Sequence, residues 1–133
     1  MNNIVTLNGI KVLIVDDSNT IRRSAEIFLH DADCKVITAV DGFDAMAKIV
    51  DNLPDVIFID IVMPRLDGYQ ACQLIKKNPR FQKTPVIMLS SKDGLFDKAK
   101  GRMAGSDEYL TKPFTKEVLL QVIQRHALQI NNN

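Results

Sequence analysis

Acidic residues and one lysine stand where apolar runs of the sequence end. Asp16 and Asp17 follow the first run, Asp60 follows the third, and Lys112 comes just after the last. If these runs are parallel strands of one sheet, their carboxyl ends meet at one edge, where open α/β sheets bind ligands. Carboxylates this close repel one another unless a cation compensates. The pattern therefore predicts a site for a divalent metal ion and a phosphoryl group.

Magnesium is the cation that suits such a cluster, because it prefers oxygen ligands and binds through one or two carboxylates, waters and phosphate oxygens. Asp17 and Asp60 fit this role, with Asp16 acting directly or through a water. The competing interpretation is that Asp16 and Asp17 cap the next helix and complement its dipole. Capping explains one acid better than two adjacent acids, so we favour metal binding.

Asp60 also suits nucleophilic chemistry, because a carboxylate can attack phosphorus when nearby cations offset the charge. Lys112 is such a cation, a compact charge on a flexible stem. Ser90, at the end of another apolar run, adds a hydroxyl at the same edge. Taken singly, Lys112 could be an ordinary solvated lysine and Ser90 a turn or cap residue. Together the strand ends indicate phosphoryl transfer.

The elements that would position these residues alternate along the chain. Short apolar runs, mostly β-branched, predict buried parallel strands at 12–15, 36–40, 56–59, 86–89 and 108–110. Apolar residues at helical spacing predict helices between and after them, with stripes at Ile21, Ala25, Phe28 and Leu29; Ala45, Met46, Ile49 and Val50; Ala71, Leu74 and Ile75; Leu95, Phe96, Ala99 and Met103; and Leu119, Val122, Ile123 and Ala127. The fourth helix, within 93–104, is the weakest.

Ser18, Asp41 and Thr115 are predicted to begin helices. Alternating strands and helices imply right-handed crossovers. The predicted fold is α/β, a doubly wound five-stranded parallel sheet with helices on both faces.

Length and composition indicate a single globular domain that could carry this site. The 133 residues predict a single domain, 1–133, with its core at about 11–128, a short N-terminal extension and a C-terminal tail. A net charge of +1 gives no positive electrostatic field that would attract nucleic acid, so we expect no nucleic-acid partner. We expect a cytoplasmic protein without membrane insertion, since no apolar run reaches a membrane span. Cys34 and Cys72 have no metal or redox spacing and are expected to be plain buried thiols.

The motifs in combination resemble the receiver domains of two-component response regulators. The resemblance spans residues 11–126 and is carried by Asp16-Asp17, Asp60, Met63-Pro64, Asp67-Gly68, Ser90, Tyr109 and Lys112-Pro113-Phe114. It implies a flavodoxin-like sheet with strand order 2-1-3-4-5, the order of a chemotaxis receiver that serves as a general example of this fold. It also implies a protein that is not an enzyme in the usual sense but catalyses its own phosphoryl transfer and slow autodephosphorylation.

The resemblance assigns roles to the acidic residues. Asp60 would be the phospho-acceptor and would take its phosphoryl group from a histidine kinase or phosphotransfer domain. Asp16, Asp17 and Asp60 would bind Mg²⁺ together with the backbone carbonyl of Val62.

It assigns roles to the other strand ends as well. Ser90 and Lys112 would contact the phosphoryl group, and Tyr109 would switch rotamer together with Ser90. The alternative for Tyr109 is a half-buried aromatic on an edge strand. The Lys112-Pro113 peptide bond is expected to be cis by the same resemblance.

Signal output is expected to be contact with another protein, since no effector domain follows the last predicted helix. We expect the downstream target on the face from Asp93 to His126, beside Tyr109. The runs 17–23 and 90–102 are most similar to single-domain receivers of the chemosensory system that controls type IV pili and twitching motility. That similarity implies a large hybrid chemosensory kinase as the phosphodonor.

Two positions are expected to tune dephosphorylation. Val62 and Lys92 lie two residues after Asp60 and Ser90, and in receivers these positions flank the water that attacks the phosphoaspartate. An apolar Val62 cannot orient this water by hydrogen bonding, so we predict slow loss of the phosphoryl group.

Three other functions share parts of the pattern. A haloacid-dehalogenase-type phosphatase also uses an aspartyl nucleophile and magnesium, but needs Asp-x-Asp after the first strand, where this chain has Asp16-Asp17-Ser18. A flavodoxin-like mononucleotide binder would need a phosphate cradle there, and two aspartates repel phosphate. A phosphorylation-independent interaction module of the same fold remains the main alternative.

Overall fold

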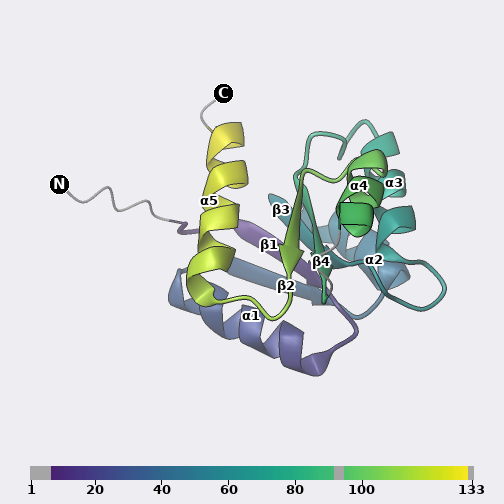
Figure 1. The fold of residues 1–133 in the computed structure, drawn as a ribbon. Coiled ribbons are helices and arrows are strands. Elements are labelled where there is room, and N and C mark those ends of the chain that lie inside the picture. The colour runs from purple at the N-terminus through teal and green to yellow at the C-terminus, as the bar shows by residue number, and fades with distance from the viewer. Residues whose placement is uncertain (1–6, 92–94, 132–133) are drawn as a thin grey trace.

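The fold is a five-stranded parallel sheet with helices on both faces, as Figure 1 shows. The computed structural model describes residues 7–91 and 95–131. The strand order is β2-β1-β3-β4-β5, which confirms the predicted architecture. The strands are β1 (Lys11–Val15), β2 (Lys35–Ala39), β3 (Val56–Asp60), β4 (Val86–Ser90) and β5 (Glu108–Thr111).

Five helices cover the sheet. They are α1 (Asn19–Asp31), α2 (Gly42–Asn52), α3 (Gly68–Lys77), α4 (Leu95–Met103) and α5 (Lys116–Asn131). Helices α1 and α5 enclose one core cluster, and α2 and α3 enclose the other, so the central strands are buried on both faces. This explains why β1, β3 and β4 are continuous apolar runs rather than alternating ones.

The strand register places the site residues. Val15 pairs with Ile59 and Asp60 pairs with Leu89, so β1, β3 and β4 end at nearly the same level. Strands β3 and β4 each run one residue further than predicted and include Asp60 and Ser90 themselves. Side chains at these ends therefore share one edge of the sheet.

Side-chain caps begin the helices that leave this edge. Ser18 and Asp41 accept hydrogen bonds from the first turns of α1 and α2, as predicted. Thr115 accepts from the backbone N–H of Val118 at the start of α5. Helix α3 begins with an unpredicted capping box, in which the side chains of Asp67 and Gln70 each accept a hydrogen bond from the other residue's backbone N–H.

The core begins before residue 11, earlier than the predicted boundary. Leu7 and Ile10 are 3% and 6% exposed and pack in the cluster beneath α1 and α5. Both thiols are buried and free, and burial raises the pKa of Cys34 and of Cys72 to about 11. The prediction of plain buried thiols is confirmed.

The apolar stripes correctly predict the helices, but not all of their residues face the core. Val50 and Leu74 are about half exposed, and on α4 the residues Leu95, Phe96 and Met103 are 86%, 78% and 87% exposed. Helix α4 instead turns Gly101 toward the sheet, where an added Cβ would lie 3.4 Å from the Met88 side chain. Because this approach is so close, α4 has no room for a large inward side chain.

Within the described residues, no helix combines the length and the apolar character needed to cross a membrane.

Candidate functional site

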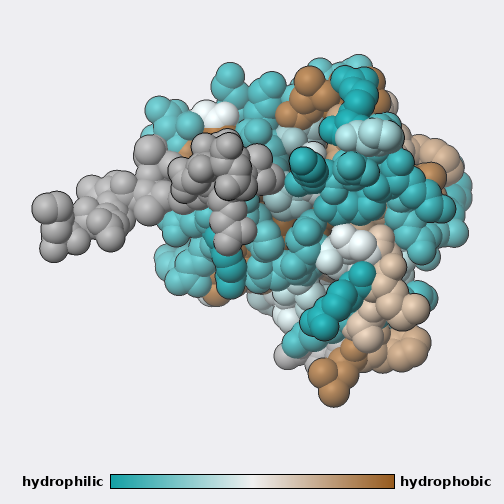
Figure 2. Space-filling view, turned by 90° about the horizontal axis from the view of Figure 1, so that it is seen from above, coloured by the Kyte–Doolittle hydropathy of each residue, from teal (hydrophilic) through white to brown (hydrophobic). Residues whose placement is uncertain are grey.

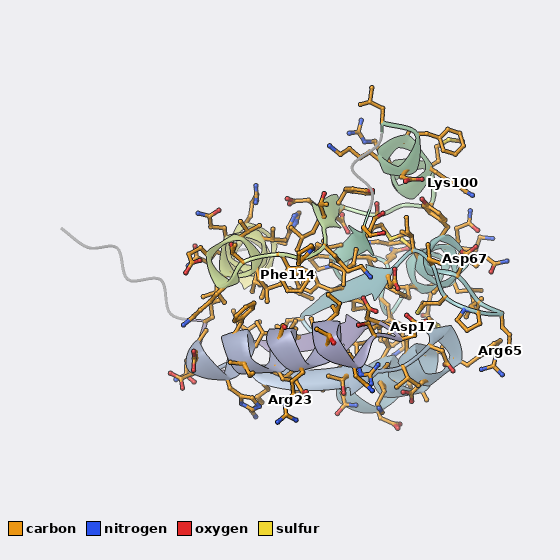
Figure 3. The ribbon with its side chains drawn as sticks, turned by 60° about the horizontal axis from the view of Figure 1, so that its bottom comes forward. Asp17, Arg23, Arg65, Asp67, Lys100 and Phe114 are labelled. Carbon is orange, nitrogen blue, oxygen red and sulfur yellow. The ribbon has the colours of Figure 1, made fainter. Side chains whose placement is uncertain are left out.

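Three carboxylates meet at the carboxyl end of the sheet. One oxygen from each of Asp16, Asp17 and Asp60 lies within 4.8 Å of the others. Asp16 is fully buried, Asp60 is 4% exposed, and Asp17 is exposed. Figure 3 shows Asp17 at the end of the sheet above the start of α1. The structure thus brings together the three acids that the sequence nominated.

Local hydrogen bonds fix the two buried carboxylates. The backbone N–H of Ser18 donates to Oδ1 of Asp16 at 2.9 Å, and the backbone N–H of Val62 donates to Oδ1 of Asp60 at 3.1 Å. Such turns, in which an aspartate bonds the backbone two residues on, are typical of Asp. The backbone hydrogen bonds therefore fix the orientation of each carboxylate without the help of a ligand.

Arg22 is a supporting residue that the sequence pattern did not predict. Its Nη1 donates to the backbone carbonyl oxygen of Asp16 at 2.6 Å, and its Nη2 bonds the side chain of Asn19. It thereby ties the first turn of α1 to the end of β1. Its position in the first turn after the acidic pair was the available signal.

Lys112 bridges the two buried acids. Its Nζ lies 2.9 Å from Oδ2 of Asp16 and 3.4 Å from Oδ1 of Asp60. Burial lowers the pKa of this ammonium, but the hydrogen bond and charge of Asp16, with a contribution from Asp60, outweigh it and raise the pKa overall. Lys112 is therefore a positive charge held inside the cluster. The Lys112-Pro113 peptide bond is cis, as the resemblance implied.

Asp60 has the perturbed carboxyl of the site. Burial raises its pKa from 3.8 to about 6, with the charge of Asp16 acting in the same direction. The Val62 N–H and Lys112 lower the pKa but do not restore it. A negative charge at Asp60 is thus costly without a further cation, which is the electrostatic condition for a metal site.

Gly68 permits the close approach of α3 to this strand end. A Cβ at this position would lie 2.4 Å from the backbone carbonyl oxygen of Asp60 and 2.7 Å from Cα of Ile61. In the sequence, Asp67-Gly68 stood out only as part of the resemblance to receiver domains. The structure supplies the reason, since only glycine lets the start of α3 pack against the backbone of Asp60.

The remaining predicted site residues lie around the cluster. Ser90 is 2% exposed at the end of β4, beside Thr111 on β5. Tyr109 is half-buried on the edge strand β5, with Lys98 Nζ 5.7 Å from its ring centre. Val62 is 73% exposed beside Asp60. Lys92 and Asp93 lie outside the described residues.

The donor set fits magnesium. Carboxylate oxygens are the ligands that Mg²⁺ prefers, and one exposed acid leaves room for waters and a phosphoryl oxygen. Asp16, Asp17 and Asp60 are the groups that could hold it, and the contribution of the Val62 backbone carbonyl stays a prediction. One lysine does not balance three carboxylates, so a divalent cation relieves the repulsion within the cluster.

Comparisons with known proteins agree with this geometry. Residues 12–124 match the response regulator receiver domain family. Protein PilG of Pseudomonas aeruginosa is 67% identical over 120 residues, which cover 90% of this chain and 89% of that protein. The probable transcriptional regulator ycf27 of Guillardia theta is 41% identical, and the chain spans only 42% of its length.

Solved structures show the same fold. Chemotaxis protein CheY4 of Vibrio cholerae superposes with a TM-score of 0.85 at 36% identity, covering 89% of this chain and 98% of that one. The receiver domain of the sensor histidine kinase PA1611 of Pseudomonas aeruginosa gives 0.83 at 28% identity, covering 90% and 98%. That structure has a magnesium ion coordinated in its active-site cleft. Sequence, fold and site together place the chain in the response regulator receiver domain family.

Proposed function

We propose that this chain is a response regulator that is phosphorylated on Asp60 in a Mg²⁺-dependent reaction and signals by contact with another protein. The observation that carries the proposal is the cluster itself: three carboxylate oxygens within 4.8 Å of one another, with the Lys112 ammonium between the two buried acids. Family membership and the magnesium ion in the related PA1611 domain support it.

The proposed reaction transfers a phosphoryl group from a phosphohistidine to Asp60. A carboxylate oxygen of Asp60 attacks phosphorus, the P–N bond breaks, and the donor imidazole takes the electron pair. The Val62 N–H and Lys112 both contact Oδ1 of Asp60. We therefore assign Oδ2 as the attacking oxygen. Bound magnesium would supply positive charge to the phosphoryl oxygens.

Other residues of the chain would stabilise the product. Lys112 would exchange part of its contact with Asp60 for a phosphoryl oxygen, and the hydroxyl of Ser90 would donate to another. Tyr109 would follow Ser90 as the switch residue. The hydrogen bond from Ser18 to Asp16 does not involve Asp60, so Asp16 would remain a fixed partner of Lys112 during the transfer.

We propose that the donor is a histidine kinase or phosphotransfer domain and that the pathway controls twitching motility through type IV pili. The 67% identity to PilG and the similarity of runs 17–23 and 90–102 support this assignment. We place the downstream target on the face from Asp93 to His126. A groove of about 260 Å³ lies on that face, lined by Lys98, Arg102, Ser106, Asp107, Glu108 and Tyr109.

The test is the intact mass of the protein after incubation with acetyl phosphate and magnesium. We expect one added phosphoryl group, absent from the Asp60→Asn variant and from a sample treated with EDTA. Asp55→Asn is the matched control, because Asp55 is an exposed acid at the other end of β3. An adduct that persists in Asp60→Asn would contradict the assignment. No adduct on the folded, magnesium-binding protein would favour the phosphorylation-independent interaction module.

A further inference from the structure

Helix α4 is amphipathic, but its apolar side faces solvent. Leu95, Phe96 and Met103 are 86%, 78% and 87% exposed, and Ala99 is exposed as well. At about 100° per residue these four positions share one arc of about 100°. We call them the α4 stripe. Such a stripe normally faces a core, and here the described part of the chain does not cover it.

The inward side of α4 lies opposite the stripe. Gly101 and Ala104 are the buried positions at this helix, and they fall on the far side of the helical wheel. Figure 3 shows α4 projecting from the body of the molecule, and Figure 2 shows hydrophobic surface at the lower edge of the view, over α4. The stripe is therefore distinct from the groove beside Tyr109, which lies between α4 and β5.

Basic residues border the stripe on both sides. On the helical wheel, Lys98 and Arg102 flank one border and Lys100 flanks the other. The Nζ of Lys100 lies 4.6 Å from the centre of the Tyr69 ring, and this contact holds the Lys100 side chain at the border of the stripe that faces α3. Among the described residues, neither Lys100 nor Arg102 forms an ion pair with an acid. This surface, an apolar arc between two basic borders, is complementary to a partner segment that carries an apolar arc between two acidic borders.

We propose that the α4 stripe docks an acidic amphipathic segment of a partner protein, most simply a helix with apolar residues at i, i+3, i+4 and i+7 flanked by Asp or Glu. This inference rests on the proposed signalling by protein contact and names the chemistry of that partner.

Two other occupants fit the charges less well. A second copy docked through the same stripe would bring the basic borders of both α4 helices together, and like charges repel. A membrane surface also attracts basic amphipathic helices, but the chain has a net charge of only +1 and α4 offers few turns. A single acidic segment satisfies both borders at once.

The test uses two fluorescein-labelled helical peptides of about 15 residues with the same Leu stripe, one flanked by Glu and one by Lys. We expect the full chain to bind the Glu peptide at least about tenfold more tightly than the Lys peptide, as measured by fluorescence anisotropy. Leu95→Gln combined with Met103→Gln should weaken binding about tenfold, because the apolar contact is lost. Val50→Gln, which changes an exposed apolar residue on α2, is the matched control and should bind normally.

Lys100→Glu provides an independent variant. It replaces one basic border and should shift the preference toward the Lys peptide. Backbone amide NMR shifts on adding the Glu peptide should centre on 95–103. The proposal is overturned if the Glu peptide does not bind, if the shifts centre on Ser106 and Tyr109, or if the stripe variants bind as the wild type does.

Further controls separate the alternatives. Concentration-dependent dimerisation lost in the stripe variants would overturn the proposal in favour of a second copy. Stripe-dependent binding to vesicles containing anionic phospholipid, without binding of the Glu peptide, would overturn it in favour of a membrane. Each binding assay is run with and without acetyl phosphate while the mass of the adduct is recorded. An adduct without peptide binding refutes only this inference, whereas peptide binding at α4 without an adduct refutes only the proposed phosphorylation.

Discussion

Replacing Asp60 by Asn should stabilise the metal-free protein at neutral pH. The carboxyl of Asp60 is 4% exposed, and its pKa is raised from 3.8 to about 6, chiefly by burial. A raised carboxyl pKa means that the folded state disfavours the charge relative to the unfolded state. Asn has the same shape, carries no charge, and can still accept the hydrogen bond from the Val62 N–H. The variant therefore avoids the cost of the buried charge.

The size of the gain follows from the shift. About 2 pKa units at about 1.4 kcal/mol each give about 3 kcal/mol in the free energy of unfolding well above pH 6. Below pH 3.8 both states of the wild type hold the proton, so the gain vanishes there. The wild type should thus lose stability relative to the variant as the pH rises from about 4 to about 6.

The assay is urea unfolding with EDTA at about pH 4 and about pH 8 for wild type and variant. Asp17→Asn is the control, because it removes a charge from the same cluster at an exposed side chain and should change stability little. A variant that is less stable than wild type at pH 8, or a difference that does not depend on pH, would refute the reasoning. Magnesium should then stabilise the wild type more than Asp60→Asn.

Other substitutions test the neighbouring parts of the site. Gly68→Ala should cost roughly 1–3 kcal/mol in unfolding free energy and slow Asp60 phosphorylation, because its Cβ would lie 2.4 Å from the Asp60 carbonyl oxygen. Gly101→Ala is the control and should cost much less in the same urea titration, because the closest contact of its Cβ would be a serine hydroxyl at 3.2 Å. Equal costs for the two variants would contradict the packing argument. Lys112→Met should lower the free energy of unfolding by roughly 3 kcal/mol, because it leaves a fully buried Asp16 without its ion-pair partner. It should also abolish the acetyl phosphate adduct. Unchanged stability would show that the contact between Lys112 and Asp16 contributes nothing to folding. Val62→Asn should speed loss of the phosphoryl group, measured as decay of the adduct mass, and a rate that is unchanged or slower would dismiss the role of this side chain.

The sequence determined the fold class and the membership of the acidic cluster. Continuous β-branched runs separated by helical spacing are a local pattern, and parallel strands buried on both faces require it. Asp16, Asp17, Asp60 and Lys112 were found because each follows such a run, and the carboxyl ends of parallel strands share an edge. The strand order itself came from resemblance, since no local pattern fixes which strands are neighbours.

Tertiary structure decided what local patterns cannot encode. The requirement for glycine at position 68 arises from the backbone of Asp60 and Ile61, which comes close to it only when α3 packs against the end of β3, so the residue itself gave no sign of it. The raised pKa of Asp60 depends on burial by several elements and on the distance to Asp16 and Lys112. The apolar stripe of α4 had the spacing of a core face, yet it lies outside, because small residues on the opposite side let that side pack against the sheet. Periodicity shows that a helix has an apolar side, whereas only the packing of the whole chain determines which side meets the core.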